Sequence, residues 1–290
     1  MDQLSLRAMG KINLGLDVLG KREDGYHEVR MIMQSVRVYD KIFLSKTKEK
    51  GISIKTNRAY LPTDENNLVY KAAKLLMDEF GIEDGVEIDL KKFIPVAAGM
   101  AGGSSDAAAV LYGMNRMFGL KLDDEQLMKR GVLIGADVPY CIMRGTVLSE
   151  GIGEILTPLK NAPDCHIVIA KPAISVSTKH VYEAYDSAEN IVHPDIDGMI
   201  EAINVGDLKA LASKLSNVLE NVTGKDYPII GELEEFMKAR GALGAIMSGS
   251  GPTVFGLYDD ENLARATYDA LRQNHMAKQT FITECFNVRR

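Results

Sequence analysis

The 290 residues are enough for one large domain or two ordinary ones with packed cores. With 46% hydrophobic and 26% charged residues, the composition excludes a disordered or fibrous chain. The formal net charge of -6 argues against a nucleic-acid-binding protein, because a surface that follows a phosphate backbone normally carries an excess of basic residues. Any anionic substrate must therefore be held locally.

The first 44 residues are predicted to form strands, because hydrophobic residues alternate through most of them. A polar connection over residues 20–27 joins these strands, and its glycines mark turns. Alternate side chains of a strand share a face, so Lys11 and Asn13 point together and away from Ile12 and Leu14. We expect this polar face to be available to a ligand.

Helices and strands alternate between residues 67 and 135. The hydrophobic spacing predicts helices over residues 67–80, 104–118 and 123–135 and a strand over residues 86–90. Ser104 stands at the N-cap position of the second helix, and Gln126 is placed for a capping-box contact in the third. Asp137 would lie just beyond the third helix, with Val138 held extended by Pro139.

A domain boundary is expected near residue 158, where a Gly-Ile-Gly turn is followed by a segment with two prolines. We predict an N-terminal domain over residues 1–158 and a C-terminal domain over residues 159–290. The second contains a strand at 166–170, helices between 177 and 221, a helix at 227–240, strands near 245 and at 254–257, a helix at 262–274 and a strand at 280–288. Strand, helices, two strands, helix and strand form a ferredoxin-like α+β order.

The cysteines and the hydrophobic segments point to a cytoplasmic protein without a membrane partner. Cys141, Cys165 and Cys285 are far apart in sequence and lack metal-ligand spacing, so we interpret them as buried reduced thiols. No signal-peptide stretch opens the chain, and no window approaches the roughly 20 apolar residues of a membrane span. The sequence indicates no particular oligomeric state.

The strongest functional signal is the segment Pro95 to Ala108, PVAAGMAGGSSDAA, in which glycines, two serines and a helix start coincide. Small residues let the backbone approach an anion, and loop N–H groups then converge with the helix N-terminus. We interpret the segment as a phosphate cradle. Ser104 and Ser105 could each offer a hydroxyl to phosphate or Mg²⁺, and Ser104 could equally serve only as a helix cap.

Several motifs resemble those of a kinase superfamily. The chain lacks a G-x-x-x-x-G-K-[ST] loop. Its glycine loop instead resembles the second motif of the galacto-, homoserine, mevalonate and phosphomevalonate (GHMP) kinases, and GAIMSGSGPT at 244–253 resembles their third. The runs KINLGLDV at 11–18, GYHE at 25–28 and GADVP at 135–139 resemble the 4-diphosphocytidyl-2-C-methylerythritol kinase family over nearly the whole chain. Two departures are Met9-Gly10, where that family commonly has Pro-Ala, and Met100-Ala101, where Leu-Gly is common.

The resemblance implies a two-domain α+β fold with an N-terminal ribosomal-protein-like β-α domain and a C-terminal ferredoxin-like domain. It implies transfer of phosphate from ATP, with Mg²⁺, to the 2-hydroxyl of a cytidine-diphosphate-linked sugar alcohol in non-mevalonate isoprenoid synthesis. Phosphoryl transfer passes through a loose transition state, so the site must align the hydroxyl and neutralise phosphate oxygens. By resemblance, Asp137 would accept the hydroxyl proton, and Lys11 would pair with Asp137 and stabilise the transferring phosphoryl.

The resemblance also implies the two binding sets. ATP would contact Asn67, Pro95, Ala97, Ala98, Gly99, Met100, Ala101, Gly102, Gly103, Ser104 and Ser105. The acceptor would contact Asn13, Tyr26, His27, Thr178 and Tyr182. Asn67 would line the adenine pocket, or serve only as a helix N-cap. Tyr182 would stack on cytosine, or be a core residue of an amphipathic helix.

The sequence is also compatible with two other functions. A homoserine or mevalonate kinase would share the glycine loop but should lack the turn at residues 25–27. A non-catalytic nucleotide sensor could use the same fold, since a fold does not determine function. A sensor has no need of both Lys11 and Asp137 beside a phosphate loop, which favours the kinase.

Overall fold

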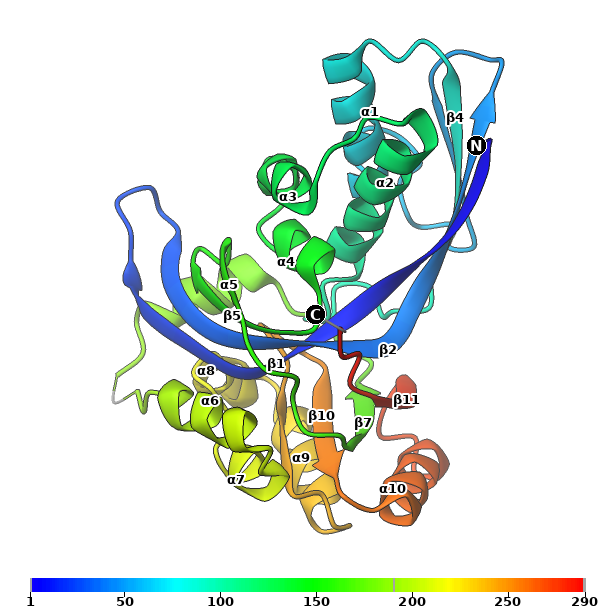
Figure 1. Ribbon diagram of the computed structural model, residues 1–290. Coiled ribbons are helices and arrows are strands. Elements are labelled where there is room, and N and C mark those ends of the chain that lie inside the picture. Colours follow the sequence, from blue (N-terminus) through cyan, green and yellow to red (C-terminus); the bar gives the residue numbers. More distant parts are fainter. Residues whose placement is uncertain (1, 190, 289–290) are drawn as a thin grey trace. The chain divides into compact units, whose positions relative to one another are not determined.

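The computed structural model describes residues 2–189 and 191–288, which divide into two compact units (Figure 1). Unit one comprises Met1–Gly10, Val38–Val96 and Ala101–Met143, and unit two comprises Lys11–Arg37, Ala97–Met100 and Arg144–Arg290. The two long strands β1 (Gln3–Lys21) and β2 (His27–Thr47) contribute residues to both units. The units thus interleave along the chain, and the expected domain boundary at residue 158 stays a prediction.

Unit one combines strands with four helices. Strand β4 (Gly85–Lys91) pairs antiparallel with residues 41–47 of β2 and parallel with β3 (Ile52–Thr56). The helices are α1 (Leu68–Phe80), α2 (Gly102–Phe118), α3 (Asp124–Val132) and α4 (Val138–Met143). Alternation puts Ile42 opposite Leu90 and Leu44 opposite Ile88, and all four are buried. Helix α2 lies close over this face, since a Cβ on Gly113 would come within 2.3 Å of Leu44.

The helix ends of unit one confirm some predictions and correct others. The capping box between Asp123 and Gln126 is present. Helix α2 begins at Gly102, so the predicted Ser104 cap is wrong: the chain enters the helix through left-handed Ala101, and Ser104 is already inside. Helix α3 ends at Val132 rather than residue 135. Val138 is not extended but opens α4, whose first turn tolerates proline because N–H groups there lack intrahelical partners.

The strands of unit two belong to two sheets, the first of which also includes β3 and β4. In the first, residues 29–34 of β2 pair antiparallel with β5 (Thr146–Gly151), which also pairs with β6 (Ile155–Pro158), while β8 (Ser216–Asn217) runs parallel to β1. The second sheet contains β7 (His166–Lys171), β9 (Gly244–Met247), β10 (Val254–Tyr258) and β11 (Gln279–Glu284). Its antiparallel order is β11-β7-β10-β9.

Helices complete unit two in the predicted ferredoxin-like order. They are α5 (Thr178–Tyr185), α6 (Ile196–Val205), α7 (Leu208–Ser213), α8 (Glu220–Asp226), α9 (Ile229–Lys238) and α10 (Glu261–Gln273). Helix α9 packs on β9 and β10, and α10 packs on β7 and β11. The α+β fold class is therefore confirmed.

The end of the chain differs from the prediction, because β11 ends at Glu284 rather than residue 288. Cys285 instead forms a bridge with Val36 of β2, and the Phe286 N–H donates to the Ser35 carbonyl at 2.7 Å. This path brings the sulfurs of Cys165 and Cys285 within 4.0 Å of one another. Within the described residues all three cysteines are buried, as expected, and no disulfide joins them.

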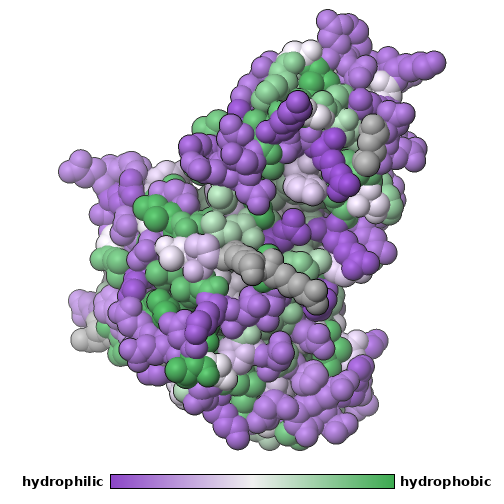
Figure 2. Space-filling model, viewed as in Figure 1, coloured by the Kyte–Doolittle hydropathy of each residue, from purple (hydrophilic) through white to green (hydrophobic). Residues whose placement is uncertain are grey.

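Hydrophilic side chains cover much of the face in view in Figure 2, in keeping with the charged fraction of the sequence. Across residues 2–189 and 191–288, no helix is long and apolar enough to cross a membrane. Hydrophobic side chains instead fill the interiors of the two units.

Candidate active site

The predicted phosphate loop has an unusual backbone. Alternate residues Ala97, Gly99 and Ala101 have positive φ angles of 50°, 71° and 52°. Left-handed residues recurring in this way turn backbone N–H groups toward an anion. Ala101 adopts the left-handed conformation at a cost of roughly 1–2 kcal/mol for an L-residue.

The loop leads into the N-terminus of α2, a helix of 17 residues with no acidic side chain in its first turn. The unpaired N–H groups and the dipole of such a helix end favour an anion. Ser105 is buried, and its hydroxyl donates to the Met9 carbonyl at 2.6 Å. Ser104 is half-buried in the same turn. The structure therefore gives Ser105 a packing role and leaves Ser104 as the better candidate for a ligand contact.

Unit one contains a buried charged cluster, between the end of β4 and α2, that the sequence reasoning missed. The Lys92 ammonium contacts Asp40 and bonds Asp106 of α2 at 2.6 Å, and all three side chains are buried. Asp40 also accepts the N–H of Ile94 at 2.8 Å. Burial, only partly offset by Lys92, raises the pKa of Asp106 well above its usual range. The cluster ties the end of β4 to the first turns of α2.

In unit two, the turn at residues 248–251 packs against the phosphate loop. The Ser248 hydroxyl donates to the Gly99 carbonyl at 3.0 Å and accepts the Asn13 N–H at 3.3 Å. A Cβ on Gly99 would lie 2.0 Å from the Ser248 carbonyl oxygen. Only glycine fits at position 99, because this close approach excludes a side chain, and the positive φ of 71° also disfavours one.

Lys11 and Asn13 share one face of β1, as predicted. The Lys11 Nζ donates to Asn13 Oδ1 at 2.6 Å, and the Lys11 N–H donates to the Met100 carbonyl at 3.2 Å. Both side chains are buried, with only 5% of Lys11 and 1% of Asn13 exposed. The face is polar but much less open to solvent than expected.

The acceptor residues of unit two lie around an aromatic pair. The rings of His27 and Tyr182 are 4.8 Å apart, and His27 Nε2 lies 2.6 Å from Asp186 Oδ1. Tyr182 is half-buried on α5 and is not a core residue, whereas Tyr26 is exposed. The Thr178 hydroxyl lies 2.8 Å from that of Ser250, in the glycine turn.

Asp186 was not identified from the sequence, because nothing in the pattern after α5 distinguishes it from a surface charge. Hydrogen bonds from Lys21 and His27 hold the pKa of this carboxyl below its usual range. An ionised Asp186 orients the His27 ring by accepting from Nε2. The other ring nitrogen of His27, Nδ1, therefore does not face Asp186.

The remaining predicted residues belong to unit one. The Asn67 side chain caps α1 by accepting the Val69 N–H at 3.1 Å, so its capping role is confirmed and its adenine role stays a prediction. Asp137 is half-buried immediately before α4, and its carbonyl accepts the Cys141 N–H at 3.0 Å. Lys11 belongs to unit two, so its pairing with Asp137 stays a prediction.

Comparison with known proteins identifies the class. Residues 67–145 match the family model of the GHMP kinases N terminal domain, and residues 199–278 match that of the GHMP kinases C terminal domain. A solved homoserine kinase from Cytophaga hutchinsonii shares the fold at a TM-score of 0.78 and 20% identity, covering 99% of this chain and 95% of that one. The two domain matches place the chain in the GHMP kinase class, and the homoserine kinase shares its fold.

Full-length relatives give a narrower assignment. The chain is 56% identical to the 4-diphosphocytidyl-2-C-methyl-D-erythritol kinase of Lachnospira eligens, over 99% of each chain. It is also 56% identical to the same kinase of Lachnoclostridium phytofermentans, over 99% of this chain and 98% of that one. A crystal structure of 4-(cytidine 5'-diphospho)-2C-methyl-D-erythritol kinase has a TM-score of 0.84 and 31% identity, covering 98% and 100%. This chain belongs to the 4-diphosphocytidyl-2-C-methyl-D-erythritol kinase family.

Proposed function

We propose that this protein transfers the γ-phosphate of ATP to the 2-hydroxyl of 4-diphosphocytidyl-2-C-methyl-D-erythritol. The observation that carries the proposal is the His27–Tyr182 pair, whose rings lie 4.8 Å apart beside Thr178 in a chain of this family. An aromatic ring offers a stacking surface to a base, and an oriented histidine offers polar atoms to the cytosine edge. We also propose that the reaction takes place in the cytoplasm, where thiols such as the three buried cysteines stay reduced.

The phosphate loop and the first turn of α2 would bind ATP. The left-handed backbone at residues 97, 99 and 101 and the helix N-terminus supply N–H groups to the phosphate oxygens. Asn67, whose side chain caps α1, would also contact adenine.

Mg²⁺ fits this arrangement as an ion carried mainly by the nucleotide. In the described residues, no three His, Cys, Asp or Glu side chains gather to hold a metal. Mg²⁺ keeps several waters and commonly uses substrate phosphates with few protein ligands. The half-buried Ser104 hydroxyl is the ligand that we propose. The ion would neutralise charge on the phosphate oxygens.

The chemical step would be carried by two residues. Asp137 accepts the proton of the attacking hydroxyl, and the Lys11 ammonium stabilises charge on the transferring phosphoryl. The 2.6 Å bond from Lys11 Nζ to Asn13 Oδ1 fixes the ammonium in position without neutralising its charge. Asn13 would also contact the acceptor.

Replacing Gly103 by valine tests the phosphate cradle. Gly103 is exposed in the first turn of α2, and a Cβ there would meet only Leu68, at 3.4 Å. The fold should therefore tolerate the change, while the added bulk blocks approach of phosphate to the N–H groups. We expect calorimetry to find ATP binding weakened far more than acceptor binding.

Gly231→Val is the matched control, because Gly231 lies in helix α9 with open space where its side chain would project. This variant should bind ATP normally. Unchanged ATP affinity in a folded Gly103→Val protein would contradict the cradle.

Replacing Tyr182 tests cytosine stacking. Tyr182→Ala should lose about 1–3 kcal/mol of acceptor binding, the usual worth of one base–aromatic stack, whereas Tyr182→Phe keeps the ring and should cost little. The loss should appear in the acceptor KM, because stacking on a remote base is equal in ground and transition states. The ATP KM should not change.

Steady-state kinetics and thermal melting of both variants separate stacking from a packing role. A packing role predicts an alanine variant that melts several degrees earlier with both KM values disturbed. An acceptor KM that stays at the wild-type value in Tyr182→Ala would rule stacking out.

A further inference from the structure

One buried side chain, that of Asn217 at the end of β8, donates hydrogen bonds to the glycine turn at residues 248–251 and to the residue before it. Only 5% of Asn217 is exposed. Its Nδ2 donates to the carbonyl oxygens of Met247 at 2.9 Å and Gly249 at 2.8 Å, while Oδ1 accepts the Leu219 N–H at 3.1 Å. Both amide hydrogens are therefore committed to the two residues that flank Ser248. Asn217 thus fixes the direction of the Ser248 backbone.

Glu220 reinforces this attachment at the first residue of α8. Its Oε2 accepts the Met247 N–H at 2.9 Å. The neighbouring Glu234 lies on α9, where burial and then Glu220 raise its pKa to about 8. Burial also raises the pKa of Glu220, and the hydrogen bond from the Met247 N–H opposes this rise.

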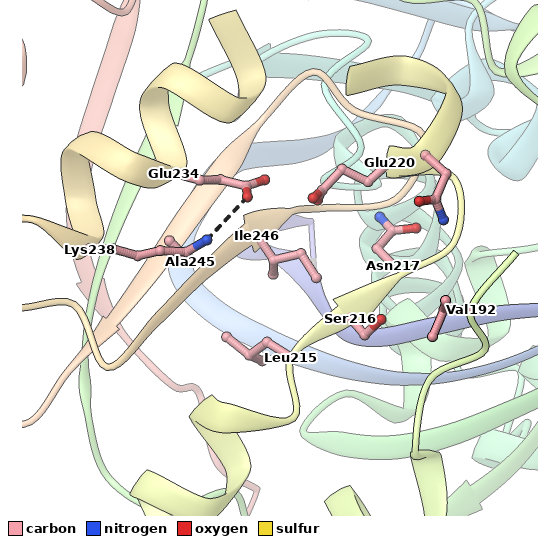
Figure 3. A pocket seen from close by; sticks show the side chains of 10 residues that line it. Val192, Leu215, Ser216, Asn217, Glu220, Glu234, Lys238, Ala245 and Ile246 are labelled. Atoms are coloured by element: carbon pink, nitrogen blue, oxygen red, sulfur yellow. Dashed lines mark ion pairs between the residues drawn. The ribbon is translucent and has the colours of Figure 1, made fainter. Parts of the chain in front are cut away.

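Asn217 and Glu220 form part of the wall of a pocket of about 260 Å³ in unit two, shown in Figure 3. The polar residues around them are Ser216, Asn221, Glu234 and Lys238. A polar pocket of this size holds water readily. Truncating Asn217 would extend the pocket, so water could satisfy the Met247 and Gly249 carbonyls. The fold should then survive while the turn loses its fixed direction.

We propose that Asn217 is a positioning residue for ATP, which acts through the glycine turn without touching the nucleotide. Ser248 lies between the two carbonyls that Asn217 holds, and its hydroxyl donates to the Gly99 carbonyl. Gly99 has no free space on that side, since its Cβ position is 2.0 Å from the Ser248 carbonyl oxygen. A shift of the turn therefore displaces the left-handed backbone of the phosphate loop. The inference rests on the proposed role of that loop in binding ATP.

The test compares Asn217→Ala with Asn221→Ala. Asn221 lines the same pocket and donates to the Val218 carbonyl at 3.1 Å, but has no hydrogen bond to the turn. Asn217→Ala should raise the ATP KM roughly tenfold, the scale of one buried hydrogen bond. The acceptor KM should change by less than about twofold, because the effect is confined to nucleotide binding. Asn221→Ala should leave both KM values near wild type.

The variant Asn217→Asp distinguishes the loss of the two donated hydrogen bonds from a change in the shape of the side chain. It is close in size, but it sets a carboxylate oxygen against the Met247 and Gly249 carbonyls. The ATP KM should rise at least as far as in the alanine variant. A wild-type ATP KM in Asn217→Asp would overturn the proposal.

Ser248→Ala shows whether the effect passes through Ser248. Adding Asn217→Ala to Ser248→Ala should raise the ATP KM little further, because residues that act in series are not additive. Multiplicative effects would overturn the proposal, as would an equal rise of both KM values with early melting. If Gly103→Val weakens ATP binding and Asn217→Ala does not, the positioning role of Asn217 is contradicted and the phosphate cradle is not. If Gly103→Val leaves ATP affinity unchanged, the cradle itself fails.

Discussion

Replacing Asp137 by asparagine is expected to lower turnover by about 10²–10⁴-fold, the range typical of losing a general base. Asparagine matches aspartate in shape but does not accept the proton of the attacking hydroxyl. Asp137 is half-buried just before α4, whose first turn is held by the Asp137 carbonyl through the Cys141 N–H. That backbone bond is unaffected by the substitution, so both substrates should still bind.

The measurements are kcat in a coupled assay and the affinity of each substrate by calorimetry. Asp124→Asn is the matched control, because Asp124 is exposed in the first turn of α3 and should give wild-type turnover. Near-normal turnover in Asp137→Asn would remove this residue from the mechanism. Loss of binding of both substrates would make its role structural.

Replacing Lys92 by methionine should lower the free energy of unfolding by about 3–5 kcal/mol, because it leaves Asp40 and Asp106 buried without a cation. Methionine fills a similar volume, so the change tests charge more than packing. Chemical denaturation measures the difference. The difference in unfolding free energy from wild type should narrow as the pH falls, because burial raises the pKa of Asp106 and protonation of this carboxyl removes uncompensated charge.

Lys91 provides the control. Lys91 is the last residue of β4, its side chain is 40% exposed, and it forms an ion pair with Asp89 at 2.8 Å. An exposed ion pair contributes about 0–1 kcal/mol, so Lys91→Met should be nearly neutral. Equal losses of unfolding free energy in the two variants would show that the buried cluster does not hold the end of β4 to α2 as described.

The fold was largely predictable because it depends on local patterns. The alternation of Ile42 and Leu44 identified a strand, and the capping box at Asp123 and Gln126 identified a helix start. The errors occurred where backbone conformation or distant pairing decided the outcome. Ala101 enters α2 in a left-handed conformation that its residue type disfavours, and Cys285 leaves its strand to pair with Val36.

The candidate site was predictable where one segment carries the chemistry. The glycine loop and the Lys11–Asn13 face each lie within a few consecutive residues. The supporting residues Asp186, Asn217 and Lys92 were missed, because each acts on a segment far away in the chain. A lone buried asparagine or an isolated charge has no sequence pattern of its own, and its partners appear only when the chain is folded.

The most direct test of the central claim is a coupled ATP-turnover assay that offers 4-diphosphocytidyl-2-C-methyl-D-erythritol, homoserine and mevalonate in parallel. We expect ADP formation with the cytidyl acceptor alone, and loss of that activity in the Asp137→Asn protein. The phosphorylated product should carry its new phosphate on the 2-hydroxyl, which phosphorus NMR would locate. Turnover with homoserine or mevalonate, or none with any of the three acceptors, would contradict the proposed function.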